Sequence, residues 1–479
     1  MDRLESWATV HFLSGPGAAA GTLLHLGLAI AVTVHVLLHK RDVPAAISWI
    51  GLAWLSPILG PALYWMFGIN RVRRRAYRIS RRYVTRRGPP PPVGAIRSEK
   101  YAALERGVGV LTRRPTLANN SIKPMRNGDE AYPVMLQAIA EAKVSIGLVS
   151  YIFFADEAGR PFIDALVAAH NRGVEVRVIV DGIGSGYFFS KAAFLLGRGG
   201  VKVVRFMHSW LPWRTAFLNL RNHKKILVVD GKRGFIGGLN ISAHNLKSSD
   251  PRTAVRDMHF DVTGPVVAQI AEAFVLDWEF ATGEELQGDA WFPTPDGCGP
   301  ALARVITSGP DQDVEKIEFM FLQAVGTARQ RIKIITPYFL PDERLVAALE
   351  LAAMRGVDVD IVIPENSDHL VMDWAVMAHV APLLIAGVKI WRAPEPFEHA
   401  KLMTIDDGWS LVGSANWDQR SLRLNFELNM EVYDPDFSAL LSEKIAARQG
   451  NEITLQWLYS WPMRVRLRNR AVRLLLPYL

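Results

Sequence analysis

The stretch that decides the fold is NHKKILVVDGKRGFIGGLN, residues 222–240, because EHAKLMTIDDGWSLVGSAN, residues 398–416, repeats its pattern. In each stretch a lysine, an aspartate and an asparagine follow a histidine after 2, 7 and 17 residues. Four residue types at three shared spacings are not expected by chance, so the chain contains an internal duplication. The two sets are His223, Lys225, Asp230 and Asn240, and His399, Lys401, Asp406 and Asn416.

Each motif predicts a strand, a tight turn and a return strand, because an Asp-Gly pair follows an apolar run in both. Residues i and i+2 share one face of a strand, so each histidine projects together with its lysine. The aspartates Asp230 and Asp406 lie by the turn. There they either bond nearby backbone or take part in the chemistry, and the sequence supports both readings equally. The asparagines close the return strands and can face the same site.

Upstream of each motif, residues 142–182 and 330–366 share the order strand, loop, amphipathic helix, strand. Such βαβ units build parallel sheets. The predicted fold class is therefore α/β, with two pseudo-symmetric domains, residues 96–285 and 300–458, packed around one site. Tyr151 and Tyr338 occupy equivalent strand ends, where core packing and substrate lining are equally supported.

Histidine, lysine and asparagine together suit a phosphate group. Lysine supplies a point charge and the asparagine amide a neutral donor for phosphate oxygens, while imidazole can act as nucleophile or as acid and base. Two motifs in pseudo-symmetric domains can place two histidines on opposite sides of one phosphorus. The alternative, two buried structural histidines, explains none of the shared spacing.

The N-terminal region reads as membrane-associated. Residues 6–39 and 43–70 contain no Asp, Glu, Lys or Arg, and each run exceeds the about 20 apolar residues that span a bilayer. We expect two transmembrane helices within residues 1–70, rather than a cleaved signal peptide, because no basic segment precedes the first run. Nine arginines in residues 71–87 then predict a cytoplasmic catalytic body in a multi-pass membrane protein.

The positive charge is concentrated at the two ends of the catalytic body. The nine arginines lie in a basic, proline-rich linker, residues 71–95, and five more lie in the tail, residues 459–479. Together they exceed the net charge of +8, so the rest of the chain is net acidic, which argues against a nucleic-acid partner. The tail predicts a basic amphipathic helix, either in the membrane interface or packed on the body. The single cysteine, Cys298, excludes an intrachain disulfide.

The two H-x-K-x(4)-D motifs, the N-terminal hairpin, PYFLPDE (337–343) and GSANWDQRSLRLNFELN (413–429) resemble the bacterial cardiolipin synthases of the phospholipase D superfamily. The resemblance covers essentially the whole chain. It implies a pair of α/β domains around one active site, a phosphohistidine intermediate, and neither metal nor cofactor. It also implies an acidic residue that hydrogen-bonds each histidine. Glu427, 28 residues after His399, matches in the second half, and Asp257, 34 residues after His223, is the candidate in the first.

The resemblance further implies transfer of a phosphatidyl group between two phosphatidylglycerol molecules, giving cardiolipin and glycerol. It assigns His223 as nucleophile and His399 as acid, with the two lysines and with Asn240 and Asn416 holding the phosphate oxygens. The alternative is a phosphodiesterase of the same superfamily that hydrolyses phospholipid or, with less support, nucleic acid. A non-enzymatic scaffold has no need of two intact motifs. The expected partners are phosphatidylglycerol and an anionic bilayer, and the sequence is compatible with a homo-oligomer.

Overall fold

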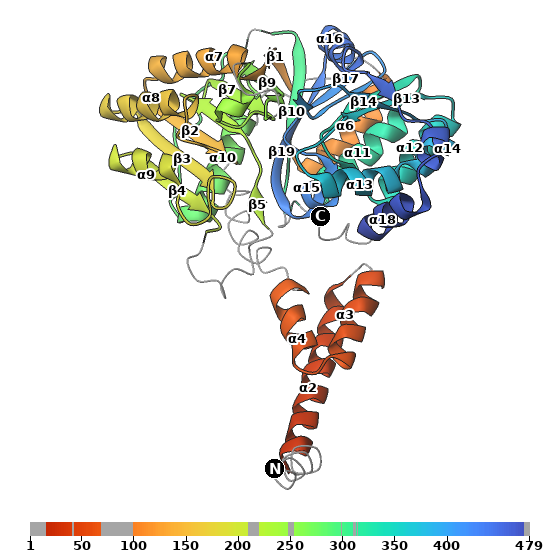
Figure 1. Cartoon of the computed structure of the whole chain (residues 1–479). Coiled ribbons are helices and arrows are strands. Elements are labelled where there is room, and N and C mark those ends of the chain that lie inside the picture. Colours follow the sequence, from red (N-terminus) through yellow and green to blue (C-terminus); the bar gives the residue numbers. More distant parts are fainter. Residues whose placement is uncertain are drawn as a thin grey trace. The chain divides into compact units, whose positions relative to one another are not determined.

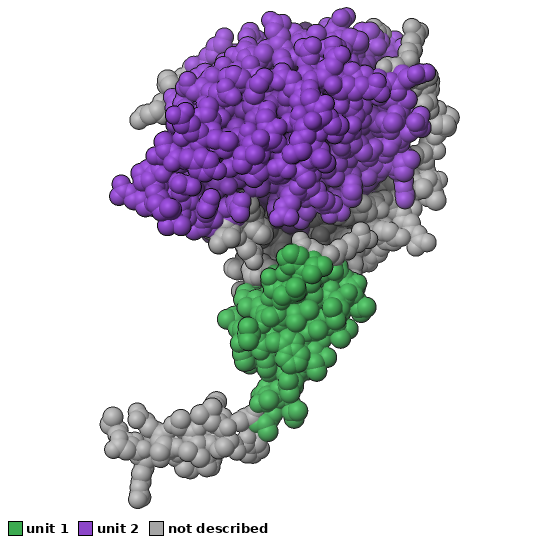
Figure 2. Space-filling model, turned by 90° about the vertical axis from the view of Figure 1, so that its right-hand side faces the viewer, with its two compact units in different colours: residues 1–72 green, residues 73–479 purple. Residues whose placement is uncertain are grey.

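The computed structural model describes residues 16–40, 43–68, 99–208, 220–247, 253–297, 299–309, 313 and 315–473. The basic run at 71–87, the linker to residue 95, Cys298 and the last six residues lie outside these ranges. The chain divides into two compact units, residues 1–72 and 73–479 (Figure 2).

The N-terminal unit contains one long apolar helix and a second, broken one. Helix α2, Pro16–His39, includes the only stretch of the described chain that is long and apolar enough to cross a membrane, Ala19–His39. The second of the two predicted transmembrane helices is not confirmed, because the second apolar run forms no single helix of spanning length in the described residues. Helix α3 ends after 13 residues (Val43–Leu55), and α4 (Leu59–Leu63) and the π-helical turn η1 (Tyr64–Gly68) follow. Pro57 lies in the break, and a proline has no amide hydrogen to continue the helix.

The second unit is built on one continuous sheet with two halves of matching strand order (Figure 1). Strands β1 and β10 pair antiparallel and join the halves. Outward from the join, each half has an antiparallel set and then a parallel set of three strands, which confirms the predicted α/β duplication. The first half runs β1 (Leu117–Arg126), β9 (Met258–Thr263), β7 (Arg233–Gly237), β6 (Ile226–Val229), β2 (Ser145–Ser150), β3 (Glu175–Asp181) and β4 (Lys202–Phe206). The second half runs β10 (Ala301–Ser308), β19 (Asn425–Tyr433), β17 (Trp409–Gly413), β16 (Leu402–Ile405), β11 (Arg331–Ile335), β13 (Asp358–Pro364) and β14 (Lys389–Ala393), with β20 (Asn451–Glu452) beyond it.

Helices cover both faces of the sheet. In the first half the buried residues of α7 (Asn127–Glu141), α8 (Gly159–Asn171) and α9 (Lys191–Arg198) form one apolar core with β2. On the other face Gly147 of β2 lies against Phe274 of α10 (Val267–Thr282). The equivalents in the second half are α11 (Lys316–Thr327), α12 (Glu343–Met354), α13 (Leu370–His379) with α14 (Ala381–Ile385), and α16 (Pro435–Ala446).

Two segments pack differently from their place in the sequence. Helix α6, Glu99–Thr112, lies within the range predicted for the first half, yet its buried residues Tyr101, Leu104 and Val108 join the core of the second half. In the tail, α17 (Leu455–Tyr459) precedes α18 (Met463–Arg473), which contacts α13. The Arg468 guanidinium lies 4.0 Å from the centre of the Trp374 ring. Of the two alternatives for the tail, the structure favours packing on the body.

Candidate active site

Short strands cross the boundary between the two halves and fix the backbone of both motif histidines. Strand β5 (Arg221–Asn222) of the first half pairs with β19 of the second, and β15 (Phe397–Glu398) of the second half pairs with β8 (Val255–Arg256) of the first. The His223 amide donates to the Phe426 carbonyl at 2.9 Å, and the His399 amide donates to the Arg256 carbonyl at 2.7 Å. Each histidine is therefore held by the half that does not contain it.

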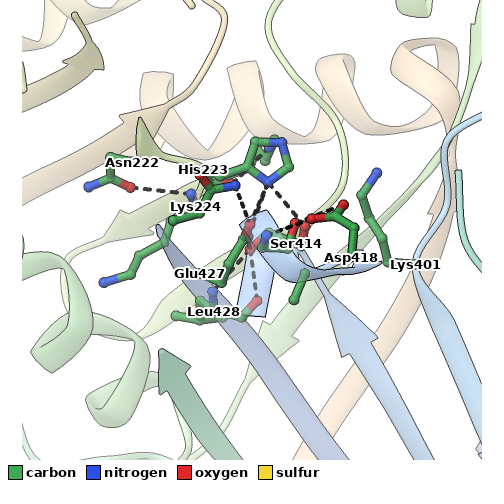
Figure 3. A network of polar contacts seen from close by, with 12 residues as sticks. Asn222, His223, Lys224, Lys401, Ser414, Asp418, Glu427 and Leu428 are labelled. Atoms are coloured by element: carbon green, nitrogen blue, oxygen red, sulfur yellow. Dashed lines mark hydrogen bonds and ion pairs between the residues drawn. The ribbon is translucent and has the colours of Figure 1, made fainter. Parts of the chain in front are cut away.

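The carboxylates also pair across the two halves. His223 Nδ1 lies 3.0 Å from Glu427 and 3.1 Å from the Ser414 carbonyl oxygen, and His399 Nδ1 lies 2.7 Å from Asp257. Figure 3 shows His223, Ser414 and Glu427 pointing toward one another. A proton held on Nδ1 by a carboxylate leaves Nε2 of each ring for chemistry. Both predicted carboxylates thus contact a histidine, each in the opposite half.

The lysines are buried beside the histidines. Lys225 Nζ donates to the His223 carbonyl at 2.7 Å, and Lys401 Nζ donates to the His399 carbonyl and lies 2.8 Å from His399 Nδ1. Burial, which disfavours an unpaired cation, lowers the pKa of Lys225 to about 7 and that of Lys401 to about 8. An anionic phosphate placed between these groups would favour their charged forms, so the site suits an anion.

The electrostatic environments of the two histidines differ. Burial and then Lys225 hold the pKa of His223 well below its usual value. Burial and then Lys401 also lower the pKa of His399, but its hydrogen bond to Asp257 opposes this shift. Burial raises the pKa of Glu427 to about 7, whereas for Asp257 the raising effect of burial is outweighed by Lys401 and His399, so its pKa is lowered. The His399 side therefore holds a carboxylate that is more readily ionised.

One cavity of about 790 Å³ brings the predicted groups together. Both motif histidines line it, as do Asn240 and Asn416. Tyr151 and Tyr338 line it as well, with the Tyr151 ring centre 4.9 Å from that of His223 in an edge-on arrangement, which favours substrate lining over core packing.

The two asparagines differ in how they are held. The side-chain oxygen of Asn240 accepts a hydrogen bond from the Ile152 amide at 3.2 Å, so its NH2 group is the part suited to donate to a phosphate. The side-chain oxygen of Asn416 is buried without a hydrogen-bond partner in the described part of the chain. Lys225 and Lys401, also buried, complete the cluster but are not among the lining residues.

The aspartates of the motifs lie at the turns and not among the cavity-lining residues. Asp230 accepts hydrogen bonds from the amides of residues 143–145, and Asp406 from those of residues 329–331. Both have a positive φ, 52° and 49°, and Asp406 also pairs with Lys100 Nζ at 2.7 Å. This placement favours the backbone-binding reading over a direct chemical role.

Sequence reasoning missed several residues that position the site. The Ser414 hydroxyl donates to Glu427 at 2.6 Å, and its equivalent in the first half is Gly238. Beside His223, Asn222 and Lys224 both donate to the buried carboxylate of Asp277 at 2.8 Å. Comparing the two motifs position by position would have marked Ser414 as a difference. The Asp277 contact joins residues more than 50 positions apart, and no local pattern reveals it.

Within the described ranges, no group of three His, Cys, Asp or Glu side chains could hold a metal ion.

Comparisons with known proteins agree with this geometry. The family model "Cardiolipin synthase, PLD-like domain" matches residues 135–278 and 321–448, and the phospholipase D-nuclease N-terminal model matches residues 27–68. Cardiolipin synthase A of Pseudomonas syringae is 36% identical over 95% of this chain and 97% of its own length. The major cardiolipin synthase ClsA of Bacillus subtilis is 31% identical over 95% and 98%. The crystal structure of phosphatidylserine synthase from Haemophilus influenzae shares the fold, with a TM-score of 0.58 and 16% identity over 80% of this chain and 100% of that one.

Proposed function

The chain belongs to the cardiolipin synthases of the phospholipase D superfamily, and from this premise we propose that it joins two phosphatidylglycerol molecules through a phosphohistidine intermediate. The observation that carries the proposal is the pair of histidines, each bonded to a carboxylate of the opposite half, that line one cavity. Such an arrangement supplies a nucleophile and an acid on two sides of one phosphorus.

In the first step, neutral His223 attacks the phosphorus of one phosphatidylglycerol through Nε2. A nitrogen–phosphorus bond forms, the phosphorus–oxygen bond to the headgroup glycerol breaks, and His399 gives that oxygen its proton. Lys225, Lys401, Asn240 and Asn416 hold the phosphate oxygens as charge shifts in the transition state. In the second step, His399 takes the proton from a headgroup hydroxyl of a second phosphatidylglycerol. That oxygen attacks the phosphorus, and cardiolipin leaves with His223 restored.

The difference between the two carboxylates supports these roles. Groups in environments that push their pKa values apart are suited to opposite acid and base tasks. The lowered pKa of Asp257 favours the charged carboxylate, which stabilises a protonated His399, while the low pKa of His223 keeps it a neutral nucleophile.

Radiolabelled substrate in a rapid-quench experiment should leave an acid-labile, base-stable adduct that peptide mapping places on His223. An adduct on His399 would reverse the two roles.

Product analysis tests the transfer reaction. Purified protein incubated with vesicles of labelled phosphatidylglycerol should yield cardiolipin and glycerol in equal amounts, without added metal or cofactor. If phosphatidic acid is the main product, water is the acceptor and the protein is a hydrolase. A strict requirement for a divalent cation would contradict a mechanism that uses only side chains.

We also propose an arrangement in the bacterial inner membrane in which both N-terminal segments, residues 16–39 and 43–68, cross the bilayer and the catalytic unit is cytoplasmic. The second segment is broken, but its 26 residues carry no charged side chain and match the N-terminal family model. The nine arginines at 71–87 support a cytoplasmic position for the catalytic unit. In this proposal the partners are phosphatidylglycerol and an anionic bilayer, and nucleic acid is not a substrate.

A further inference from the structure

The cavity departs from the symmetry of the duplication at two arginines. Arg221 stands two residues before His223, where the second half has Phe397 two residues before His399. Arg420 stands four residues after Asn416, where the first half has His244 four residues after Asn240. All four side chains line the cavity. Two positions that are arginine in one copy are therefore replaced, in the other copy, by an aromatic ring and an imidazole.

The fold brings the two arginines to the same side of the cavity. Strand β5 carries Arg221 and pairs with β19, where its Cα partner is Asn425. Helix α15, Gln419–Arg423, carries Arg420 and directly precedes β19. The Arg221 side chain hydrogen-bonds Tyr151, whose ring packs edge-on against His223. Arg221 is thus one side chain away from the reacting histidine.

The charges around Arg420 indicate that this side can accept an anion. Burial and then repulsion from Arg221 lower the pKa of Arg420, so the two cations act on each other. The carboxylates Asp181 and Asp418 oppose this shift, and both also accept hydrogen bonds from backbone amides. Asp181 accepts from the amides of residues 183, 184 and 222, and Asp418 accepts from the Ser421 amide at 2.7 Å. An anion bound between the guanidinium groups would relieve their repulsion.

The other side of the cavity has a different character. Phe397 and Tyr338 line it together with the carboxylates Asp368 and Glu395. Asp368 accepts a hydrogen bond from the Tyr338 hydroxyl, and Glu395 accepts one from Asn366 at 3.3 Å. Carboxylates repel a phosphate, so this side is not suited to a second anionic group.

The proposed reaction requires one phosphate between the histidines and another away from them. Two phosphates bridged by a glycerol cannot both occupy the central position, so the second must lie on one side. Guanidinium groups bind phosphate oxygens with two parallel hydrogen bonds, which suits them to this task. We propose that Arg221 and Arg420 bind the phosphate of the second phosphatidylglycerol, an inference that rests on the proposed function and adds the specificity of the acceptor.

Two reactions of the full-length enzyme separate this role from catalysis. Cardiolipin synthesis requires a phosphate at the central position between the histidines and a second phosphate at the arginines. Exchange of labelled free glycerol into phosphatidylglycerol requires only the phosphate at the central position. The variants are Arg221→Phe with Arg420→His, which install the residues of the opposite half, and Arg221→Lys with Arg420→Lys, which keep the charge. Arg160→Gln, an exposed arginine on α8 paired with Asp164, is the matched control.

We expect the Phe/His variant to lose cardiolipin synthesis by about tenfold or more, as for lost hydrogen bonds to a charged group, while glycerol exchange stays within about threefold of wild type. The lysine variant should recover part of the synthesis, and Arg160→Gln should match wild type. Retained exchange also shows that the variant is folded.

Equal losses of both reactions in the Phe/His variant would overturn the inference, because the arginines would then serve the central phosphate or the fold. Unchanged cardiolipin synthesis would overturn it as well. A wild-type protein that forms no cardiolipin and incorporates no glycerol would refute the proposed function itself, and with it this inference.

Discussion

Each motif histidine depends on a partner that is remote in sequence. His223 and Glu427 are separated by 204 residues, and His399 and Asp257 by 142. If the two histidines act in one cycle, as proposed, the effects of removing them should not be additive. We expect His223→Ala and His399→Ala each to lower kcat by at least about a thousandfold, and the double variant to be hardly slower than either. Steady-state cardiolipin synthesis measures this. Near-wild-type activity in either single variant would contradict a site that uses both histidines.

The carboxylate of Glu427 is fully buried and its pKa is raised from 4.5 to about 7. A raised pKa means that the folded state binds the proton more tightly than the unfolded state. The stabilisation is therefore complete below about pH 4.5 and is lost as the pH rises through about 7. Glu427→Gln mimics the protonated form, so its melting temperature relative to wild type should be higher at pH 8 than at pH 5.

Activity should move in the opposite direction in the same variant. The neutral amide of Glu427→Gln cannot balance the positive charge that the His223 ring gains when its Nε2 bonds to phosphorus, so we expect kcat to fall about a hundredfold or more. Glu452→Gln, on the exposed strand β20, serves as the control and should change neither property. A Glu427→Gln protein whose relative stability is independent of pH would show that this carboxyl is already ionised at low pH.

At the scale of elements, replacing a turn aspartate should lower the stability of the fold, whereas replacing a motif histidine should lower turnover. Asp230→Ala removes the acceptor of three backbone amides, which should destabilise the fold by about 1–3 kcal/mol. Asp230→Asn should cost less, because asparagine tolerates the positive φ of 52° and keeps one acceptor oxygen. Denaturant unfolding, with kcat measured on the remaining folded protein, should show loss of stability with little loss of turnover. A large loss of kcat at unchanged stability would assign Asp230 a direct chemical role.

The duplicated strands, the tight turns and the shared face of histidine and lysine could be predicted because they follow from spacing along the chain. The contacts that complete the site could not. The pairing of β5 with β19 and of β15 with β8 joins distant segments, so nothing near His223 in sequence points to Glu427. The packing of α6 on the second half could not be predicted either, because it also joins segments that are distant in the sequence. Pro57 marks the break in the second apolar run, which the absence of charged residues does not reveal.

At the scale of the whole molecule, the break after α3 makes the path of the second N-terminal segment testable. In a Cys298→Ser background, Lys40→Cys lies between α2 and α3, and Glu99→Cys lies at the exposed start of α6. If both segments cross the bilayer, a membrane-impermeant maleimide should label position 40 in spheroplasts and position 99 only after lysis. Labelling of both positions, or of neither, before lysis would mean that residues 43–68 enter and leave on one side. The Cys298→Ser parent protein, which has no cysteine to label, is the control.

The exchange of carboxylates between the halves has a consequence for biosynthesis. During translation, His223 leaves the ribosome long before Glu427 has been added to the chain. Asp257 is likewise made long before its partner His399. His223 therefore lacks its carboxylate partner until Glu427 has been added, whereas Asp257 is already present when His399 is made. We therefore expect a nascent chain that stops before Glu427 to carry no working active site, even if its N-terminal segment has already reached the membrane.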